Sequence, residues 1–298
     1  MTEEILVPTD GSEGATAALE HALEVAEAAG ATVHALFVVD TTRDGLRPDD
    51  DDVIDVFDER GGEIVAEAAE RAAEHGVAVV EAVEHGDPHE TILAYAEEAS
   101  VDLIVMGTHG RRGLRRLFLG SVTERVVRTA TVPVLTVRET TVDARTFPYE
   151  DVLVAIDGSE CATAALERAS ELAAEHGATL HVLSVVDVTA AGTEVASGQL
   201  LEALESDARG VVEDAAANAR ERGVESVVTA VEVGSVSRAI TGYADEEGID
   251  LAVVGTHGRR GVNRYVMGSV AELVVRTASC PVLTVRRADE NGAHDEAQ

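Results

Sequence analysis

Two stretches of the chain repeat one pattern of glycine and serine. The pattern is a glycine, a second glycine three residues later, a third after nine further residues, and then a serine: Gly107, Gly110, Gly120 and Ser121, and again Gly255, Gly258, Gly268 and Ser269. Glycine lets main-chain N–H groups approach an anion because no Cβ intervenes. Each serine begins a Ser-Val-x-Glu sequence, a capping box that predicts a helix N-terminus. Phosphate binding is the chemistry that this combination predicts.

Arginine is concentrated beside these glycines. Seven of the 23 basic residues lie between the second and third glycines of the two stretches: Arg111, Arg112, Arg115, Arg116, Arg259, Arg260 and Arg264. Clustered positive charge suits a polyphosphate, and the alternative is that these arginines neutralise carboxylates at a domain interface. The chain contains no lysine. That absence excludes Schiff-base chemistry and the lysine-dependent phosphate loop, so a phosphate site must use backbone N–H groups, arginine or a metal.

An aspartate follows the first predicted strand of each half of the chain. Asp10 lies in Pro-Thr-Asp-Gly-Ser and Asp157 in Ala-Ile-Asp-Gly-Ser. A carboxylate at the end of a strand, facing a phosphate site, can hold Mg²⁺ while the phosphates supply the other oxygen ligands. Asp-Gly-Ser is equally a good turn and helix N-terminus, so a structural role is the alternative interpretation.

The two halves of the chain are duplicates. Residues 5–40 match residues 152–187 with an offset of 147, and residues 101–138 match residues 249–286 with an offset of 148. A period of this length indicates tandem domains and not a solenoid. We predict one domain over 1–138, a linker over 139–150, a second domain over 151–287, and a disordered tail over 288–298.

Within each half, short runs of β-branched residues alternate with longer segments rich in Ala and Glu. In the first half we predict strands over 5–7, 33–39, 77–83, 103–106 and 133–137, and helices over 14–29, 63–75, 88–98 and 121–129. Strands separated by helices pair in parallel, with helices on both faces. The predicted fold class is α/β: two tandem, doubly wound, Rossmann-like domains, each with a five-stranded parallel sheet. Ligands bind such sheets where the strand order reverses, which selects the loops after the first and fourth strands.

Composition narrows the function further. The chain has 56 acidic and 23 basic residues, a formal net charge of −33, which disfavours nucleic acid and membrane surfaces as partners. An acidic, lysine-free chain resembles proteins of salt-loving archaea, because molar salt screens such self-repulsion. Two cysteines fit a reducing compartment. We expect a cytoplasmic protein, since no apolar stretch approaches the length of a membrane span and residues 1–4 lack the features of a signal peptide.

These features together resemble the universal stress protein family in tandem form. The resemblance rests on a strand ending in Asp, the glycine and serine pattern and a final Pro-Val-Leu-x-Val strand in each half, and it implies binding of an adenine nucleotide. In the first half it places the phosphates and ribose on the glycines and serine, the phosphates and metal at Asp10, and adenine at the main chain near Val38. The expected nucleotide-binding residues are Pro8, Thr9, Asp10, Val38, Gly107, Gly110, Arg111, Gly120, Ser121 and Val122, and in the second half Ala155, Ile156, Asp157, Val185, Gly255, Gly258, Arg259, Gly268, Ser269 and Val270.

The resemblance also implies how the halves assemble. Members of the family pair domains edge to edge through the last strand, and an uncovered strand edge over 133–137 or 281–285 would be an aggregation hazard. We therefore expect an internal pseudo-dimer of the two halves, with a further homodimer left open. The change from Pro8-Thr9 to Ala155-Ile156 predicts that the two sites differ in affinity.

The expected function is binding of ATP with Mg²⁺, in one or both halves, by a stress-response regulator or sensor. A slow ATPase or phosphotransferase using the same pocket is one alternative, and a nucleotide-free adaptor is another. The sequence does not distinguish ATP from AMP or cyclic AMP. His85 and His89 lack the further ligands that a metal site needs, and His109 and His257, inside the glycine stretches, are expected to shape the loop or touch the ligand rather than to act as a base.

Overall fold

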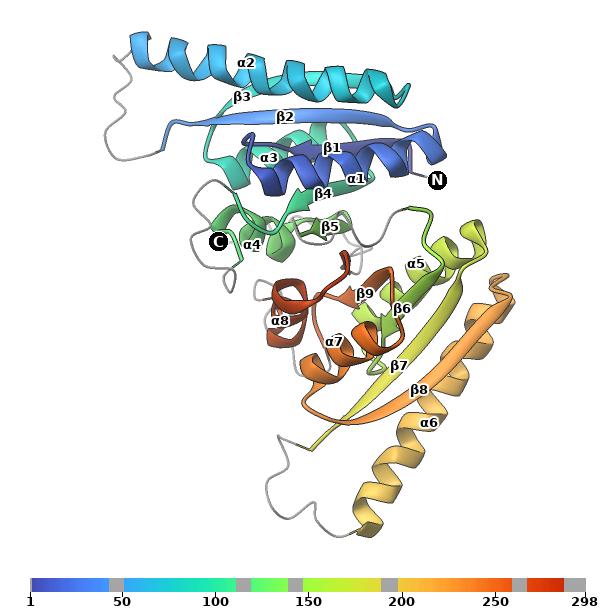
Figure 1. Ribbon diagram of the computed structural model, residues 1–298. Coiled ribbons are helices and arrows are strands. Elements are labelled where there is room, and N and C mark those ends of the chain that lie inside the picture. Colours follow the sequence, from blue (N-terminus) through green and yellow to red (C-terminus); the bar gives the residue numbers. More distant parts are fainter. Residues whose placement is uncertain are drawn as a thin grey trace, which may run out of the picture.

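The strands of the computed structural model form one continuous sheet through both halves of the chain. The structure describes residues 2–42, 51–110, 119–138, 147–188, 198–258 and 267–286. Within these residues the sheet has ten strands in the order β3-β2-β1-β4-β5-β10-β9-β6-β7-β8. Figure 1 shows α2 lying along β3 at one end of this sheet and α6 along β8 at the other.

Each half supplies five strands and four helices, as predicted. The first half contains β1 (Glu4–Pro8), α1 (Glu13–Ala29), β2 (Thr32–Asp40), α2 (Asp51–Glu74), β3 (Val79–Gly86), α3 (Pro88–Glu98), β4 (Leu103–Gly107), α4 (Ser121–Thr129) and β5 (Val134–Val137). The second half contains β6 (Asp151–Ala155), α5 (Glu160–His176), β7 (Thr179–Asp187), α6 (Gly198–Glu221), β8 (Ser226–Gly234), α7 (Val236–Glu246), β9 (Leu251–Gly255), α8 (Ser269–Thr277) and β10 (Val282–Val285). All strand pairs within a half are parallel.

Helices cover both faces of the sheet, and each face has one apolar core that crosses from half to half. Alternate residues of a strand point to opposite faces, so Ile5 and Val7 join the core beneath α1, α2, α5 and α6. Leu6, between them, joins the core beneath α3, α4, α7 and α8. The near-continuous apolar runs of the strands reflect this burial on both sides.

The two halves join by antiparallel pairing of their last strands. Leu135 of β5 lies opposite Leu283 of β10 at the centre of the pairing. The Thr136 hydroxyl donates to the carbonyl oxygen of Val282 at 3.1 Å, and the Thr284 hydroxyl donates to the carbonyl oxygen of Val134 at 3.0 Å. The expected internal pseudo-dimer is confirmed, and the edges of β5 and β10 cover each other.

Helix α2 corrects one sequence-based prediction. The sequence predicts a helix from residue 63, whereas α2 begins at Asp51 and passes through Gly61 and Gly62. A Cβ on Gly61 would lie 2.7 Å from the Phe37 ring of β2. This glycine therefore lets the helix lie close to the sheet, a tertiary reason that local propensity does not reveal.

The residues that connect the halves pack against α1 and α5 where they are described. The linker expected over 139–150 is described only from residue 147, and the tail expected over 288–298 lies outside the described residues. Tyr149 is buried, and its hydroxyl lies 2.7 Å from Nε2 of His21 on α1. The Phe147 ring packs edge-on against Tyr149 and against His176 of α5. This segment thus stabilises the junction of the two halves.

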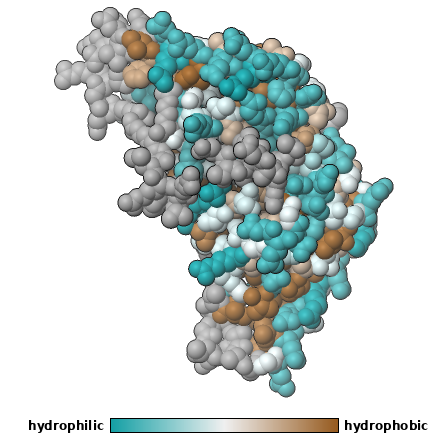
Figure 2. Space-filling model, viewed as in Figure 1, coloured by the Kyte–Doolittle hydropathy of each residue, from teal (hydrophilic) through white to brown (hydrophobic). Residues whose placement is uncertain are grey.

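The visible face of the molecule is mostly hydrophilic. Figure 2 shows hydrophilic residues over much of the visible face, with an apolar patch over β7 and β8. Among the described residues, no helix combines the length and the apolar character that crossing a membrane requires.

Gly61 and Gly62 form a matched pair for testing the packing of α2. Gly61→Ala should lower the free energy of unfolding by about 1–3 kcal/mol, since its methyl group meets the buried Phe37 ring. Gly62→Ala should raise it by about 0.5–1 kcal/mol, because nothing lies within 4 Å of that methyl group and alanine favours the helix. Urea denaturation of both variants checks this, and equal effects of the two substitutions would contradict it.

His21 should make the stability pH-dependent. Burial lowers the pKa of His21 to about 4 from its ordinary 6.5, so the folded protein keeps this ring neutral while the unfolded chain protonates it near pH 6.5. As the pH falls from 6.5 toward 4, the protein should lose about 3 kcal/mol of stability through this group. Urea denaturation across this range measures the loss. A double variant, His21→Phe with Tyr149→Phe, should show a shallower pH dependence, and parallel curves for parent and variant would count against this role.

Candidate functional site

The candidate site of the first half lies where the strand order reverses. β1 pairs with β2 on one side and with β4 on the other, so the loops after β1 and β4 leave the same edge of the sheet in adjacent positions. The second half repeats this arrangement with β6 between β7 and β9. These are the two loops per half that the sequence selected.

The loop after β1 is a turn that caps the next helix. Oδ1 of Asp10 accepts from the N–H of Ser12 at 3.0 Å, and Oγ of Ser12 accepts from the N–H of Ala15 in the first turn of α1 at 3.3 Å. Gly11 between them has a φ of 71°, a conformation that favours glycine. The structural role that the sequence left open for Asp-Gly-Ser is therefore present.

The second half builds the same turn. Oδ1 of Asp157 accepts from the N–H of Ser159 at 2.9 Å, and Oγ of Ser159 accepts from the N–H of Ala162 at 3.2 Å. This role uses one oxygen of each aspartate and does not decide whether the carboxylate also binds a metal.

The loop after β4 folds back on itself to bring its glycines together. The N–H of Gly120 donates to the carbonyl oxygen of Thr108 at 2.9 Å. The Thr123 hydroxyl of α4 donates to the carbonyl oxygen of Gly107 at 2.9 Å. These bonds hold the start of α4 directly beside the end of β4. In the second half Gly268 donates to Thr256 at 2.9 Å in the same way.

The two loops meet at the aspartates. A Cβ built on Gly110 would lie 2.7 Å from Oδ2 of Asp10, and one built on Gly258 would lie 2.8 Å from Oδ2 of Asp157. Residues a hundred positions apart in the sequence are thus in contact in both halves. The absence of a side chain at these glycines is what lets the carboxylates lie against the glycine loops.

Helices α4 and α8 begin one residue earlier than the capping-box prediction requires. The N-caps are Gly120 and Gly268, and neither has a side-chain cap hydrogen bond. Ser121 is the first helical residue, and Glu124 pairs with Nη2 of Arg128 at 2.6 Å instead of reaching back to the N-cap. The predicted capping boxes are therefore wrong, but the helix N-termini lie where they were expected. Their N–H groups receive no cap from the helix's own side chains, which leaves room for an anion.

Both glycine loops contain a histidine with an unpaired ring nitrogen. Nδ1 of His109 lies 2.9 Å from Oγ1 of Thr108, and Nδ1 of His257 lies 3.0 Å from Oγ1 of Thr256. The Nε2 atom of each ring is buried and has no hydrogen-bond partner among the described residues. A buried polar atom without a partner costs about 1–3 kcal/mol. The same arrangement recurs in both halves, so it belongs to the shared design of the two loops.

The remaining predicted residues lie around the two loops that follow the first and fourth strands of each half. Thr9 continues the β1 pairing, since its N–H donates to the carbonyl oxygen of Leu36 at 2.8 Å, and Ile156 does so with Leu183 at 2.8 Å. The other residues at these strand ends and helix starts are Pro8, Ala155, Val38, Val185, Val122 and Val270. Arg111 and Arg259, together with the other loop arginines, lie outside the described residues.

Sequence analysis missed the packing of Gly107 against the first turn of α1. A Cβ on Gly107 would lie 2.5 Å from the carbonyl oxygen of Gly14 in the first turn of α1. In the second half Gly255 faces the backbone of Cys161 in the same manner. The glycine at the end of β4 therefore serves close packing of α1 against the strand. The signal for this was the glycine at position 14, which is unusual in the first turn of an otherwise alanine-rich helix.

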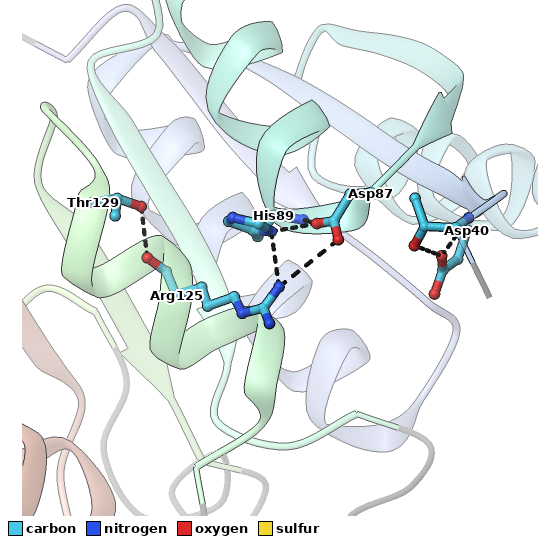
Figure 3. A network of polar contacts seen from close by, with 6 residues as sticks. Asp40, Asp87, His89, Arg125 and Thr129 are labelled. Atoms are coloured by element: carbon cyan, nitrogen blue, oxygen red, sulfur yellow. Dashed lines mark hydrogen bonds and ion pairs between the residues drawn. The ribbon is translucent and has the colours of Figure 1, made fainter. Parts of the chain in front are cut away.

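A polar network lies beside the first site, and Ser235, Ser237 and Leu273 occupy the duplicate positions of its three members in the second half. In Figure 3, Arg125 of α4 points toward Asp87 and His89 at the start of α3, with His89 close to Asp87 and Nη1 of Arg125 at 3.8 Å from Oδ2 of Asp87. Burial raises the pKa of Asp87, but hydrogen bonds from His89 outweigh it and lower that pKa below its usual range. Nε2 of His85 lies 2.8 Å from Oδ1 of Asp58. Each histidine thus pairs with an aspartate.

The described residues contain no group of three or more His, Cys, Asp or Glu side chains that could hold a metal ion. Asp10 and Asp157 each supply one carboxylate, to which a bound phosphate would add further oxygen ligands for a magnesium ion.

Comparison with known proteins agrees with this architecture. The family model described as "Universal stress protein family" matches residues 1–138 and again 148–286. A universal stress protein of Methanocaldococcus jannaschii is 37% identical over 140 residues, which cover 46% of this chain and 82% of that protein. The crystal structure of a universal stress protein from Archaeoglobus fulgidus aligns with a TM-score of 0.73 at 26% identity, covering 96% of this chain and 99% of that one.

A Pseudomonas aeruginosa protein of unknown function shares the fold, with a TM-score of 0.69 at 21% identity over 96% of this chain and 93% of that chain. The family model thus matches the chain twice in succession, and a solved member spans both copies. The chain belongs to the universal stress protein family, in its tandem two-domain form.

Proposed function

We propose that each half binds an adenine nucleotide, ATP with Mg²⁺, and that nucleotide binding serves regulation in a stress response. The single observation that carries this proposal is the contact between the aspartate after the first strand and the glycine loop after the fourth, repeated in both halves. It unites a carboxylate, a glycine loop and a helix N-terminus in one place. These are the parts that a phosphate chain with a bound divalent cation requires.

Three further features support phosphate as the ligand. Gly120 has φ −60° and ψ 139° at the start of α4, and no side chain caps this helix. The Nε2 atoms of His109 and His257 are buried and lack a partner among the described residues. The chain contains no lysine, so arginine is the side chain that would supply a permanent positive charge. The N–H groups and the helix dipole would bind the phosphates together with Arg111 and Arg259, the arginines expected beside them.

Binding of a nucleotide to each half would allow the protein to act as a sensor. A ligand that binds only the folded state stabilises it by about 2.7 kcal/mol at a hundredfold excess over Kd, enough to bias an equilibrium between two domain arrangements. The cytoplasmic location, the salt-loving origin and the regulatory role remain predictions. Steady release of phosphate from ATP well above background would instead favour the enzymatic alternative.

Gly120→Val tests the first site. A Cβ at this position would be 3.4 Å from the nearest atom, the carbonyl oxygen of Thr108, and the backbone conformation suits any residue. The variant should therefore fold, while its side chain occupies the space of the phosphates. Calorimetry in molar salt with Mg²⁺ should detect ATP binding to the parent protein and the loss of one binding site in the variant. Unchanged binding stoichiometry and affinity would refute the site, and no binding of ATP, AMP or cyclic AMP to the parent would refute the function.

Asp10→Asn tests the metal. The amide keeps an oxygen for the N–H of Ser12, which donates to Oδ1 at 3.0 Å in the parent, but removes the charge that Mg²⁺ would use. ATP affinity with Mg²⁺ should fall about tenfold, equal to about 1.4 kcal/mol. With EDTA it should not fall, because the substitution also removes repulsion between carboxylate and phosphate. Gly268→Val in both proteins confines the calorimetric signal to the first site, and equal losses with and without Mg²⁺ would contradict a metal role.

A further inference from the structure

The helices that begin at the two candidate sites end at the junction between the halves. α4 has nine residues and is therefore about 13 Å long. It starts at the glycine loop of the first site and returns toward the beginning of β5. Because β5 and β10 are antiparallel, the beginning of β5 lies beside the end of β10. The C-terminus of α4 is thus close to the other half of the molecule, and α8 is placed in the corresponding way.

An arginine from the opposite half holds the last turn of each helix. Nη1 of Arg286, which follows β10, donates to the carbonyl oxygen of Arg128 in α4 at 3.2 Å. Nη1 of Arg138, which follows β5, donates to the carbonyl oxygen of Ala278 at the end of α8 at 3.1 Å. The last carbonyl groups of a helix have no partner within it and carry the negative end of its dipole. A guanidinium ion there satisfies both requirements and fixes the position of the helix end.

Each of these arginines also adjoins the glycine loop of its own half. The carbonyl oxygen of Val285, the residue before Arg286, accepts from the N–H of Thr256 in the second loop at 3.0 Å. The carbonyl oxygen of Val137, before Arg138, accepts from the N–H of Thr108 in the first loop at 3.0 Å. A side chain anchored beside one site therefore holds the helix that begins at the other.

We propose that Arg286 and Arg138 are positioning residues in trans: Arg286 sets the position of α4 for ligand binding at the first site, and Arg138 sets the position of α8 for the second. This inference rests on the proposed function. α4 can bind a phosphate only if its N-terminal N–H groups are held at the right distance from the glycine loop. A short, rigid helix transmits a displacement of its C-terminus to its N-terminus. Neither site is then complete within its own half.

The test measures each site alone. With Gly268→Val only the first site binds, and with Gly120→Val only the second. Arg286→Met keeps most of the apolar stem and removes the donors. It should weaken ATP binding at the first site about fivefold, the effect of about 1 kcal/mol, and leave the second site unchanged. Arg138→Met should do the reverse. Arg286→Lys, which keeps the charge near the helix end, should restore part of the affinity of the first site.

Thr284→Val is the matched control. It removes a hydrogen bond from the same strand pairing, to the carbonyl oxygen of Val134 at 3.0 Å, and that bond involves neither Arg286 nor Arg138. It should lower stability with no selective loss at either site. If it reproduces the pattern of Arg286→Met, or if Arg286→Met weakens both sites equally or neither, the inference is overturned.

Amide hydrogen exchange without ligand separates this inference from the proposed function. Arg286→Met should speed exchange in the first turns of α4 and not of α8, and Arg138→Met should have the opposite effect. Absence of nucleotide binding in the parent would refute the proposed function. The crossed exchange pattern would then support the positioning role, and its absence would overturn it.

Discussion

The antiparallel pairing of β5 with β10 is the interaction on which the rest of the architecture depends. It converts two five-stranded sheets into one, closes the edges that the duplication would otherwise expose, and lets each apolar core run through both halves. It also places the end of each final strand beside the last turn of the other half's helix. Joining the halves and supporting the sites are therefore consequences of the same four-residue strands.

The chemistry of the sites follows from a restriction in composition. A chain of net charge −33 without lysine depends on arginine for any side-chain cation at a polyphosphate. The fold compensates by bringing main-chain groups together: a glycine loop, a helix N-terminus without a side-chain cap, and a carboxylate suited to a shared divalent ion. Screening by salt weakens long-range repulsion between charges far more than it weakens short hydrogen bonds of this type.

The duplication has not kept the halves identical. His21 of α1 is buried against Tyr149, while its duplicate on α5 is Arg168, which donates to the Thr2 hydroxyl at 3.0 Å. His89 pairs with Asp87 and Arg125 beside the first site, and serine occupies its duplicate position. These differences lie around the sites and the junction, whereas the glycine frame is preserved. The two halves thus share the glycine loops and differ in the residues around them.

The sequence by itself determined the duplication, the strand and helix order and the glycine frame, because apolar periodicity and glycine spacing are local properties of the chain. Tertiary structure decided two features of the site. It brings Asp10 against Gly110, and it makes Gly120, not Ser121, the N-cap of α4. The start of α2 was also decided by tertiary structure: local propensity disfavours Gly61 inside a helix, and the Phe37 ring against which it packs explains its presence there. A contact between two distant segments cannot be predicted from the local pattern of either segment, so the tertiary structure decides such contacts.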